Sequence, residues 1–296
     1  MFNSSLAREM DAYIELRSAA FSDSLVSNDK RVLWSLDQYL VRAEFQGKNL
    51  TEEILTAWAK TLSGKSKTVK GKLVVVRGFG KYLNTLGHQS FLPTLPKVKS
   101  DYIPYIFSDE EIVSIFHYAD NLTPQNPRSC SSFFQLKIPM ALRILYSCGT
   151  RLQETMSLQR KDVDFKNRTL FLKKTKFSKE RVIPVHESLI AVMERYCLTL
   201  GIMHEPEAFL FPGRKEGSHY TTRQMDSWFS ETLKLADIDQ RERDCHERGA
   251  CLHCFRHLFV LKSMQQLEAA GHSVDMNDLL LPTYLGHECL LDTDKY

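Results

Sequence analysis

Apolar residues recur at three- and four-residue spacing through four stretches of the first hundred residues. Such spacing gathers them on one face of a helix. The pattern therefore predicts helices over residues 7–20, 30–43, 51–62 and 68–86. Several helices of this length, joined by short polar turns, favour a small bundle. We expect a helical first domain over residues 1–92, followed by a proline-punctuated linker over residues 93–106.

Beyond the linker the pattern becomes mixed. Ser108 with Glu111 three residues later predicts a capping box, and Phe107 and Ile112 suit a hydrophobic staple. Apolar spacing predicts helices over residues 133–148, 222–236 and 252–270, and alternation predicts strands over residues 163–165, 169–172 and 181–185. The expected fold class is mainly α, with a small antiparallel β-sheet in a second, mixed α/β domain over residues 107–296.

Composition places the chain among ordinary globular proteins. It has 296 residues, of which 43% are hydrophobic and 25% charged, enough for one large or two modest domains. No apolar run approaches the roughly 18 residues that span a bilayer, and the polar start is not a signal peptide. Seven cysteines form an odd set without framework spacing, which favours reduced thiols. We expect a cytoplasmic protein without a membrane segment.

Basic residues are concentrated toward the amino terminus. Residues 1–100 carry a net charge of +6 and the remainder −3. Between Lys60 and Lys81 seven residues are basic and none is acidic. Such a segment suits a polyanion, because each lysine or arginine that meets a phosphate releases condensed counterions. A solvated helix face is the alternative interpretation.

Five short motifs follow one another in the second domain. They are Gly149-Thr-Arg-Leu-Gln-Glu154, Thr175-Lys-Phe-Ser-Lys-Glu-Arg181, His253-Cys-Phe-Arg256, Leu285-Gly-His287 and Tyr296, nine residues after His287. A capping box of Thr150 with Gln153 is expected to place Arg151 in the first turn of a short helix. In order and spacing, the motifs resemble the signature of the tyrosine recombinases, or phage-integrase family. The resemblance covers roughly residues 108–296, and the basic helical first hundred residues resemble the family's core-binding domain.

Two arginines suit the chemistry of this family. Cleaving a DNA phosphodiester without a metal ion requires cations that hold the charge developing on the phosphoryl oxygens. A guanidinium is always protonated and presents a planar fork to phosphate. Arg151 and Arg256 are the candidates. Glu154 is expected to support Arg151, and a purely structural ion pair between the two is the alternative.

The resemblance assigns roles to four further side chains. Tyr296 is the expected nucleophile, which would form a 3′-phosphotyrosyl bond and free a 5′ hydroxyl. Lys176 is the expected general acid for the leaving 5′ oxygen, although most turn lysines are simply solvated. His253, three residues before Arg256 on one helix face, would accept the nucleophile's proton or hold a phosphoryl oxygen. His287 would add another hydrogen bond to the phosphate.

A DNA clamp of two domains follows from the resemblance. We expect a C-shaped site-specific recombinase or integrase on double-stranded DNA, with a homo-tetramer on two recombination sites, from a prokaryotic mobile element or phage. The helix over residues 68–86 is the best candidate for the major groove. The candidate DNA-binding residues are Lys65, Lys67, Lys70, Lys72, Arg77, Lys81, Lys97 and Lys99.

Other interpretations stay open from the sequence. A DNA-binding regulator that keeps the clamp without cleaving is the main alternative. A metal-dependent nuclease would need clustered carboxylates, for which Asp292 and Asp294 are a thin case. Cys245, Cys251 and Cys254 invite a zinc interpretation, but they lack two paired ligand sets. We therefore expect no cofactor and no metal.

The position of Tyr296 at the end of the sequence is unusual for this family. Members usually continue into a carboxy-terminal segment that docks on a neighbouring protomer. A terminal carboxylate, with a pKa of about 3.3 to 3.7, would put a negative charge beside the attacking phenol. The expectation is a truncated chain that binds DNA but assembles and cleaves poorly.

Overall fold

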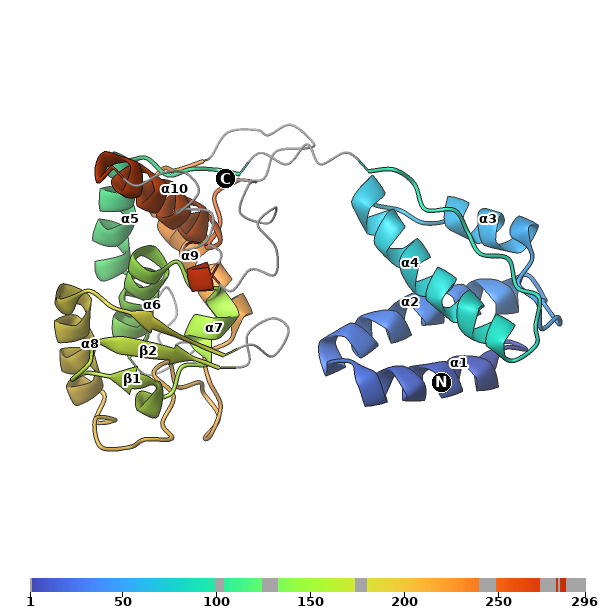
Figure 1. Ribbon diagram of the computed structural model, residues 1–296, viewed down its shortest axis with the longest axis horizontal. Coiled ribbons are helices and arrows are strands. Elements are labelled where there is room, and N and C mark those ends of the chain that lie inside the picture. Colours follow the sequence, from blue (N-terminus) through green and yellow to red (C-terminus); the bar gives the residue numbers. More distant parts are fainter. Residues whose placement is uncertain are drawn as a thin grey trace. The chain divides into compact units, whose positions relative to one another are not determined.

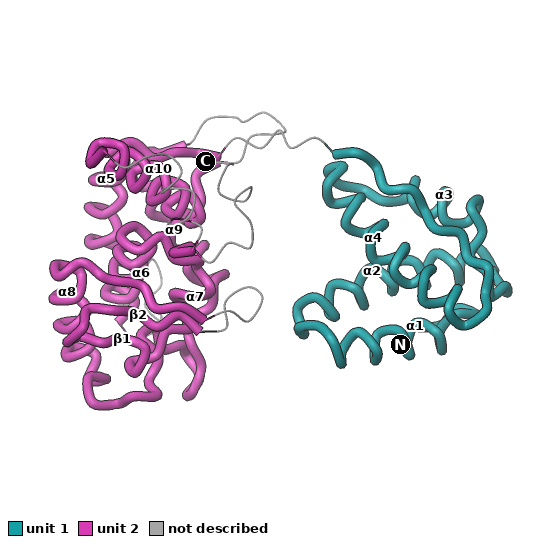
Figure 2. The backbone as a smooth tube through the Cα atoms, in the orientation of Figure 1, with its two compact units in different colours: residues 1–100 teal, residues 101–296 magenta. Residues whose placement is uncertain are grey.

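The structure, a computed structural model, describes residues 2–98, 104–123, 133–173, 180–239, 249–271, 281 and 283–285. The chain divides into two compact units, residues 1–100 and residues 101–296 (Figure 2). This division falls inside the segment for which the sequence predicts a linker. In the part of the chain that is described, no helix is long and apolar enough to cross a membrane.

The described part of unit 1 is a bundle of four helices (Figure 1). They are α1 (Ala7–Ala20), α2 (Asp23–Arg42), α3 (Glu52–Lys60) and α4 (Ser66–Thr85). Helix α2 begins earlier than the apolar spacing predicts, because its first turns carry exposed residues that leave no periodic signal. Leu36, Trp58 and Phe79 are among the side chains that close the core of this unit.

The chain that follows α4 is extended and fixed to the bundle. The Asn84 side chain exchanges two hydrogen bonds with the backbone of Ser90, at 3.1 and 2.7 Å. Arg77 Nη1 donates to the carbonyl oxygens of Leu92 at 3.3 Å and Pro93 at 2.8 Å. Residues as far as Pro93, the first expected linker residue, are thus held against unit 1.

Unit 2 consists of helices and a small sheet that lies toward one end of the unit (Figure 1). Its described elements are α5 (Asp109–Asp120), α6 (Phe134–Cys148), α7 (Leu152–Met156), the 3₁₀ turn η2 (Arg160–Asp162), β1 (Val163–Asp164), β2 (Thr169–Leu172), β3 (Arg181–Pro184), α8 (Glu187–Thr199), α9 (Thr222–Leu235) and α10 (Cys254–Ala269). The mainly α fold with a small antiparallel sheet is therefore confirmed.

The sheet has the strand order β1-β2-β3, with antiparallel pairing throughout. Leu170 pairs with Ile183 and Leu172 with Arg181. Leu170, Leu172 and Ile183 are buried in the core, because alternate residues of a strand face the same side. This register puts Arg181 at the end of the hairpin that carries the motif of residues 175–181.

One local prediction in unit 2 is confirmed, and one helix of this unit was not predicted. Ser108 and Glu111 form the predicted capping box, with Ser108 N–H donating to Glu111 Oε2 at 2.8 Å. Helix α8 was not among the predicted elements, although Leu189, Met193 and Tyr196 carry helical spacing and are buried.

Gly71 and Gly78 both lie inside α4 and form a matched pair for a test. A Cβ at Gly71 would meet no atom within 4 Å, whereas a Cβ at Gly78 would lie 2.7 Å from Tyr13 Oη. Alanine is more stable than glycine in a helix by about 0.5–1 kcal/mol. We expect Gly71→Ala to raise the unfolding free energy of unit 1 by that amount and Gly78→Ala to give no gain. Chemical denaturation with hydrogen exchange of α4 amides measures both, and equal effects would contradict this packing.

Candidate active site

Arg151 stands at the junction of two helices. Helix α6 ends at Cys148 and is followed by Gly149, whose φ of +55° lies in the left-handed region. Arg151 is the N-cap of α7, and its N–H donates to Glu154 Oε2 at 3.0 Å. The predicted capping box of Thr150 with Gln153 is therefore wrong. The helix begins one residue later, because the Glu154 carboxylate takes the Arg151 amide while the Thr150 hydroxyl bonds to that of Thr155 at 2.7 Å.

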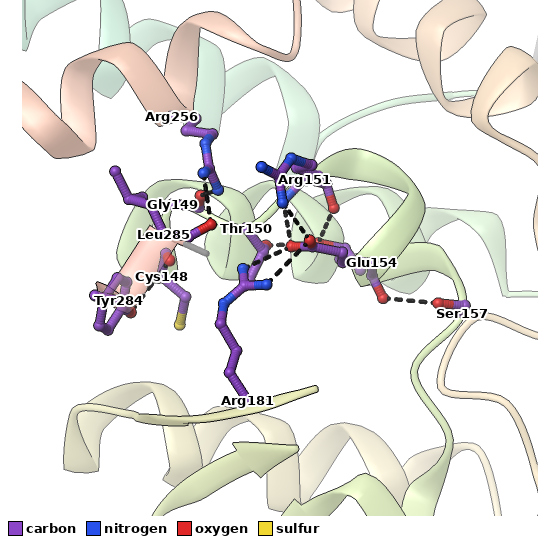
Figure 3. A network of polar contacts seen from close by, with 11 residues as sticks. Cys148, Gly149, Thr150, Arg151, Glu154, Ser157, Arg181, Arg256, Tyr284 and Leu285 are labelled. Carbon is purple, nitrogen blue, oxygen red and sulfur yellow. Dashed lines mark hydrogen bonds and ion pairs between the residues drawn. The ribbon is translucent and has the colours of Figure 1, made fainter. Parts of the chain in front are cut away.

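The carboxylate of Glu154 is shared by two arginines (Figure 3). Arg151 Nη1 donates to its Oε1 at 2.8 Å, and Arg181 Nη2 donates to its Oε2 at 2.9 Å. The side chain of Glu154 is only 4% exposed. Burial alone would raise the pKa of Glu154, but the charge and hydrogen bonds of Arg181, with those of Arg151, bring it below the usual value. Glu154 is thus a buried, ionised anchor.

Arg181 is not among the candidate site residues expected from the sequence. The side chain is 12% exposed, and its Nη1 also reaches Glu154 Oε1 at 3.2 Å. Two guanidiniums on one carboxylate leave the three side chains of Arg151, Glu154 and Arg181 with a net charge of +1. The available signal was the Lys-Glu-Arg ending of the hairpin motif, but the partner lies 27 residues away.

Arg256 joins three separate parts of unit 2. The residue is 1% exposed. Its Nη1 donates to the Gly149 carbonyl at 2.8 Å, and its Nη2 donates to the Leu285 carbonyl at 2.8 Å (Figure 3). Gly149 precedes Arg151 by two residues, and Leu285 precedes His287 by two. Helix α10 thereby brings the end of α6 and residues 283–285 to one guanidinium.

Residues 283–285 are also held through Tyr284. Its hydroxyl donates to the carbonyl of Cys148, the last residue of α6, at 3.1 Å. Its ring stacks on Phe259 of α10, with the ring centroids 5.3 Å apart. Burial raises the pKa of Tyr284, which therefore stays a neutral hydrogen-bond donor. Tyr284 therefore fixes residues 283–285 to α6 and α10, the two helices that Arg256 also links.

His253 is exposed and directly precedes α10. Its ring meets the buried ring of His257 edge to face, with centroids 4.8 Å apart. Burial, followed by the charges of His253 and Arg256, lowers the pKa of His257 to about 4. His257 is therefore neutral near pH 7 and packs behind the exposed candidate His253.

The hairpin that carries the expected general acid is anchored on both sides of its turn. Lys173, at the end of β2, forms an ion pair with the buried carboxylate of Asp162. Arg181, at the start of β3, is bound to Glu154. Lys176 itself lies outside the described residues, as do His287, Tyr296 and Lys99.

The candidate DNA-binding residues of unit 1 differ in their surroundings. Lys65, Lys67, Lys81 and Lys97 are exposed, whereas Lys70 and Lys72 are half-buried. Lys72 Nζ lies 3.4 Å from the Ser63 carbonyl oxygen. Arg77 differs most, because its guanidinium donates to the backbone of Leu92 and Pro93.

Comparison with known proteins identifies the relatives of this chain. The sequence profile described as the phage integrase family matches residues 106–290. The putative integrase/recombinase y4rE of Sinorhizobium fredii (strain NBRC 101917 / NGR234) is 25% identical over 299 residues, covering 98% of this chain and 91% of that protein. The tyrosine recombinase XerD of Rickettsia conorii (strain ATCC VR-613 / Malish 7) is 24% identical over 229 residues, covering 71% of each.

Two solved structures have a similar fold. One is the XerH site-specific recombinase bound to difH substrate in a pre-cleavage complex, with a TM-score of 0.69, 18% identity and coverage of 99% of this chain and 81% of that one. The other is a lambda integrase dimer bound to a COC′ core site, with a TM-score of 0.71, 15% identity and coverage of 98% and 76%.

The buried His257 predicts a loss of stability in acid. Its folded pKa of about 4 lies below the unfolded value of about 6.5. The unfolded chain therefore takes up the proton first, and the unfolding free energy of unit 2 falls as the pH drops from 6.5 to 4, by up to roughly 3 kcal/mol. Hydrogen exchange of α10 amides at several pH values measures this loss.

A pair of variants isolates the contribution of His257. His257→Asn should flatten the pH dependence between 6.5 and 4, whereas His117→Asn, at an exposed position of α5, should keep it. If wild type and His257→Asn lose the same stability over this range, His257 is not the group responsible.

Proposed function

The chain belongs to the phage integrase family, and from that premise we propose that it recombines specific DNA sites through a covalent 3′-phosphotyrosyl intermediate, without a metal ion in the chemistry. It is a DNA-cleaving and rejoining enzyme of the tyrosine recombinase type, as its relatives are. The observation that best supports the proposed mechanism is the buried guanidinium of Arg256, fixed beside the Arg151 junction by the Gly149 carbonyl.

Arg151 and Arg256 would stabilise the transition state in which phosphorus is pentacoordinate. Negative charge grows on the phosphoryl oxygens during attack, and prearranged guanidiniums stabilise it without reorganising at that moment. Glu154 orients Arg151, and Arg181 bonds to both oxygens of the same carboxylate. Because two guanidiniums share one carboxylate, the cluster has a net positive charge that is available to the phosphate.

Cleavage would exchange one phosphate ester for another. The phenol oxygen of Tyr296 attacks phosphorus, its proton passes to His253, and the bond from phosphorus to the 5′ oxygen breaks. Lys176 protonates the leaving 5′ oxygen. His287 donates a hydrogen bond to the phosphate. Attack by a 5′ hydroxyl on the phosphotyrosine reverses these steps and rejoins a strand, so no nucleotide cofactor is needed.

Unit 1 would supply much of the affinity for double-stranded DNA. The exposed lysines of α4 and its flanks can neutralise backbone phosphates, and α4 is the element proposed for the major groove. Arg77 is better explained as a support for the extended segment that ends at Pro93. By analogy with the family, we propose a clamp of the two units around the duplex and a homo-tetramer on two sites.

The nucleophile can be tested with a suicide duplex. The recognised sequence is first recovered by selecting a random duplex library on the immobilised protein. A nicked version of that sequence should then trap a covalent adduct with the wild type, because the freed fragment diffuses away. Tyr296→Phe should abolish the adduct and keep DNA binding.

The outcomes of this test separate the candidate functions. Adducts that persist in Tyr296→Phe would exclude Tyr296 as the nucleophile. Binding by the wild type without any adduct would favour the non-cleaving regulator.

The shared carboxylate predicts a role for Arg181 in the rate of cleavage. Without Arg181, Glu154 can turn both oxygens to Arg151 and neutralise it. We expect Arg181→Gln to slow adduct formation by about tenfold to hundredfold, as a misplaced group does, with DNA affinity close to wild type. Arg181→Lys should restore part of the rate. Arg168→Gln, which removes an exposed charge beside the same sheet, is the control and should retain the rate. Equal rates for all variants would exclude this role.

A further inference from the structure

Two cysteines face each other at the start of α10. Cys251 and Cys254 belong to a Cys-x-x-Cys sequence, and their Sγ atoms are 3.6 Å apart. Cys254 is fully buried and Cys251 is half-buried. The proposed cleavage mechanism uses neither thiol, although His253 stands between them in the sequence.

The separation of the two sulfurs indicates how they can be used. A disulfide would hold them about 2.05 Å apart, so the distance of 3.6 Å describes two separate thiols. Two thiolates on one tetrahedral zinc ion, each at about 2.3 Å, lie about 3.8 Å apart. We propose, against the expectation of no metal drawn from the sequence, that Cys251 and Cys254 bind one zinc ion together.

The backbone around the pair is folded as a ligand loop would require. Cys254 N–H donates to the Cys251 carbonyl at 2.9 Å, which closes a tight turn and turns both side chains to the same side. Cys251 N–H lies 3.4 Å from Cys254 Sγ. Ala250 N–H is bound by the Asp239 carboxylate, which fixes the entry to this loop.

The two sulfurs supply half of a tetrahedral site. Among the described residues, no group of three or more histidine, cysteine or acidic side chains gathers around a common point. Cys245, which is near the pair in the sequence, lies outside the described residues. The proposal rests on the sulfur pair, and the number of thiolates around the ion is measured in the test.

The ion would act on structure rather than on the phosphate. It would clamp the four-residue turn from Cys251 to Cys254, which carries His253 and leads into α10, the helix of Arg256. The metal binding itself does not depend on the proposed function, whereas any effect on cleavage does.

Metal content tests the proposal directly. Protein purified under reducing conditions with zinc present should retain about one zinc per chain by elemental analysis after gel filtration, and Cys251→Ser or Cys254→Ser should lose it. Cys197→Ser, which alters another fully buried cysteine in α8, should keep it. Zinc retained by both Cys251→Ser and Cys254→Ser would overturn the assignment.

A second measurement remains valid if a serine variant fails to fold. Cobalt(II) added to metal-free wild-type protein should produce a thiolate-to-cobalt charge-transfer band with an intensity for two or more thiolates. Bound metal should also protect Cys251 from alkylation. Absence of that band, or a Cys251–Cys254 disulfide found by mass spectrometry in freshly reduced protein, would overturn the proposal. Adduct assays are separate, so failure of the recombinase mechanism would leave this result unchanged.

Discussion

A buried guanidinium, that of Arg256, organises unit 2. Arginine does not lose its proton inside a protein, so each buried N–H needs an acceptor. Arg256 finds carbonyl acceptors at Gly149 and Leu285. Those atoms belong to parts of the chain far apart in sequence, so the requirements of one side chain bring together the end of α6, the start of α10 and the segment before His287. The geometry of the candidate site depends on this convergence.

The second organising group has the opposite charge. Glu154 closes the N-terminus of α7 and binds Arg151 and Arg181 with the same two oxygens. One carboxylate thereby links the arginine junction to the β-hairpin. Since two cations meet one anion, the cluster remains positive overall. This net positive charge would attract a phosphodiester, whereas an isolated ion pair would present no net charge.

Much of this arrangement could be predicted from the sequence, because the order and spacing of the motifs indicate which residues belong to one site. The junction at Arg151, its pairing with Glu154 and a helix that begins near His253 and carries Arg256 were all expected. The partners of Arg256 are backbone carbonyls, and backbone atoms leave no sequence signal. Arg181 lay within a motif, but its contact depends on strand register. The capping box predicted at Thr150 is wrong because the capping-box rule considers only the residue three positions later, which is Gln153. In the structure the carboxylate of Glu154 instead accepts the Arg151 N–H while it also binds the side chains of Arg151 and Arg181.

The use of backbone acceptors affects how the site tolerates mutation. The oxygens that hold Arg256 belong to the main chain, so no side-chain replacement at Leu285 can delete its acceptor. Gly149 is more restricted, since a Cβ there would lie 2.5 Å from Phe259 Cδ1. Glu154 offers a contrast, because one substitution removes its carboxylate from both arginines. Arg256 is therefore held by main-chain atoms that a side-chain substitution cannot remove. Arg151 instead depends on one acidic side chain, that of Glu154.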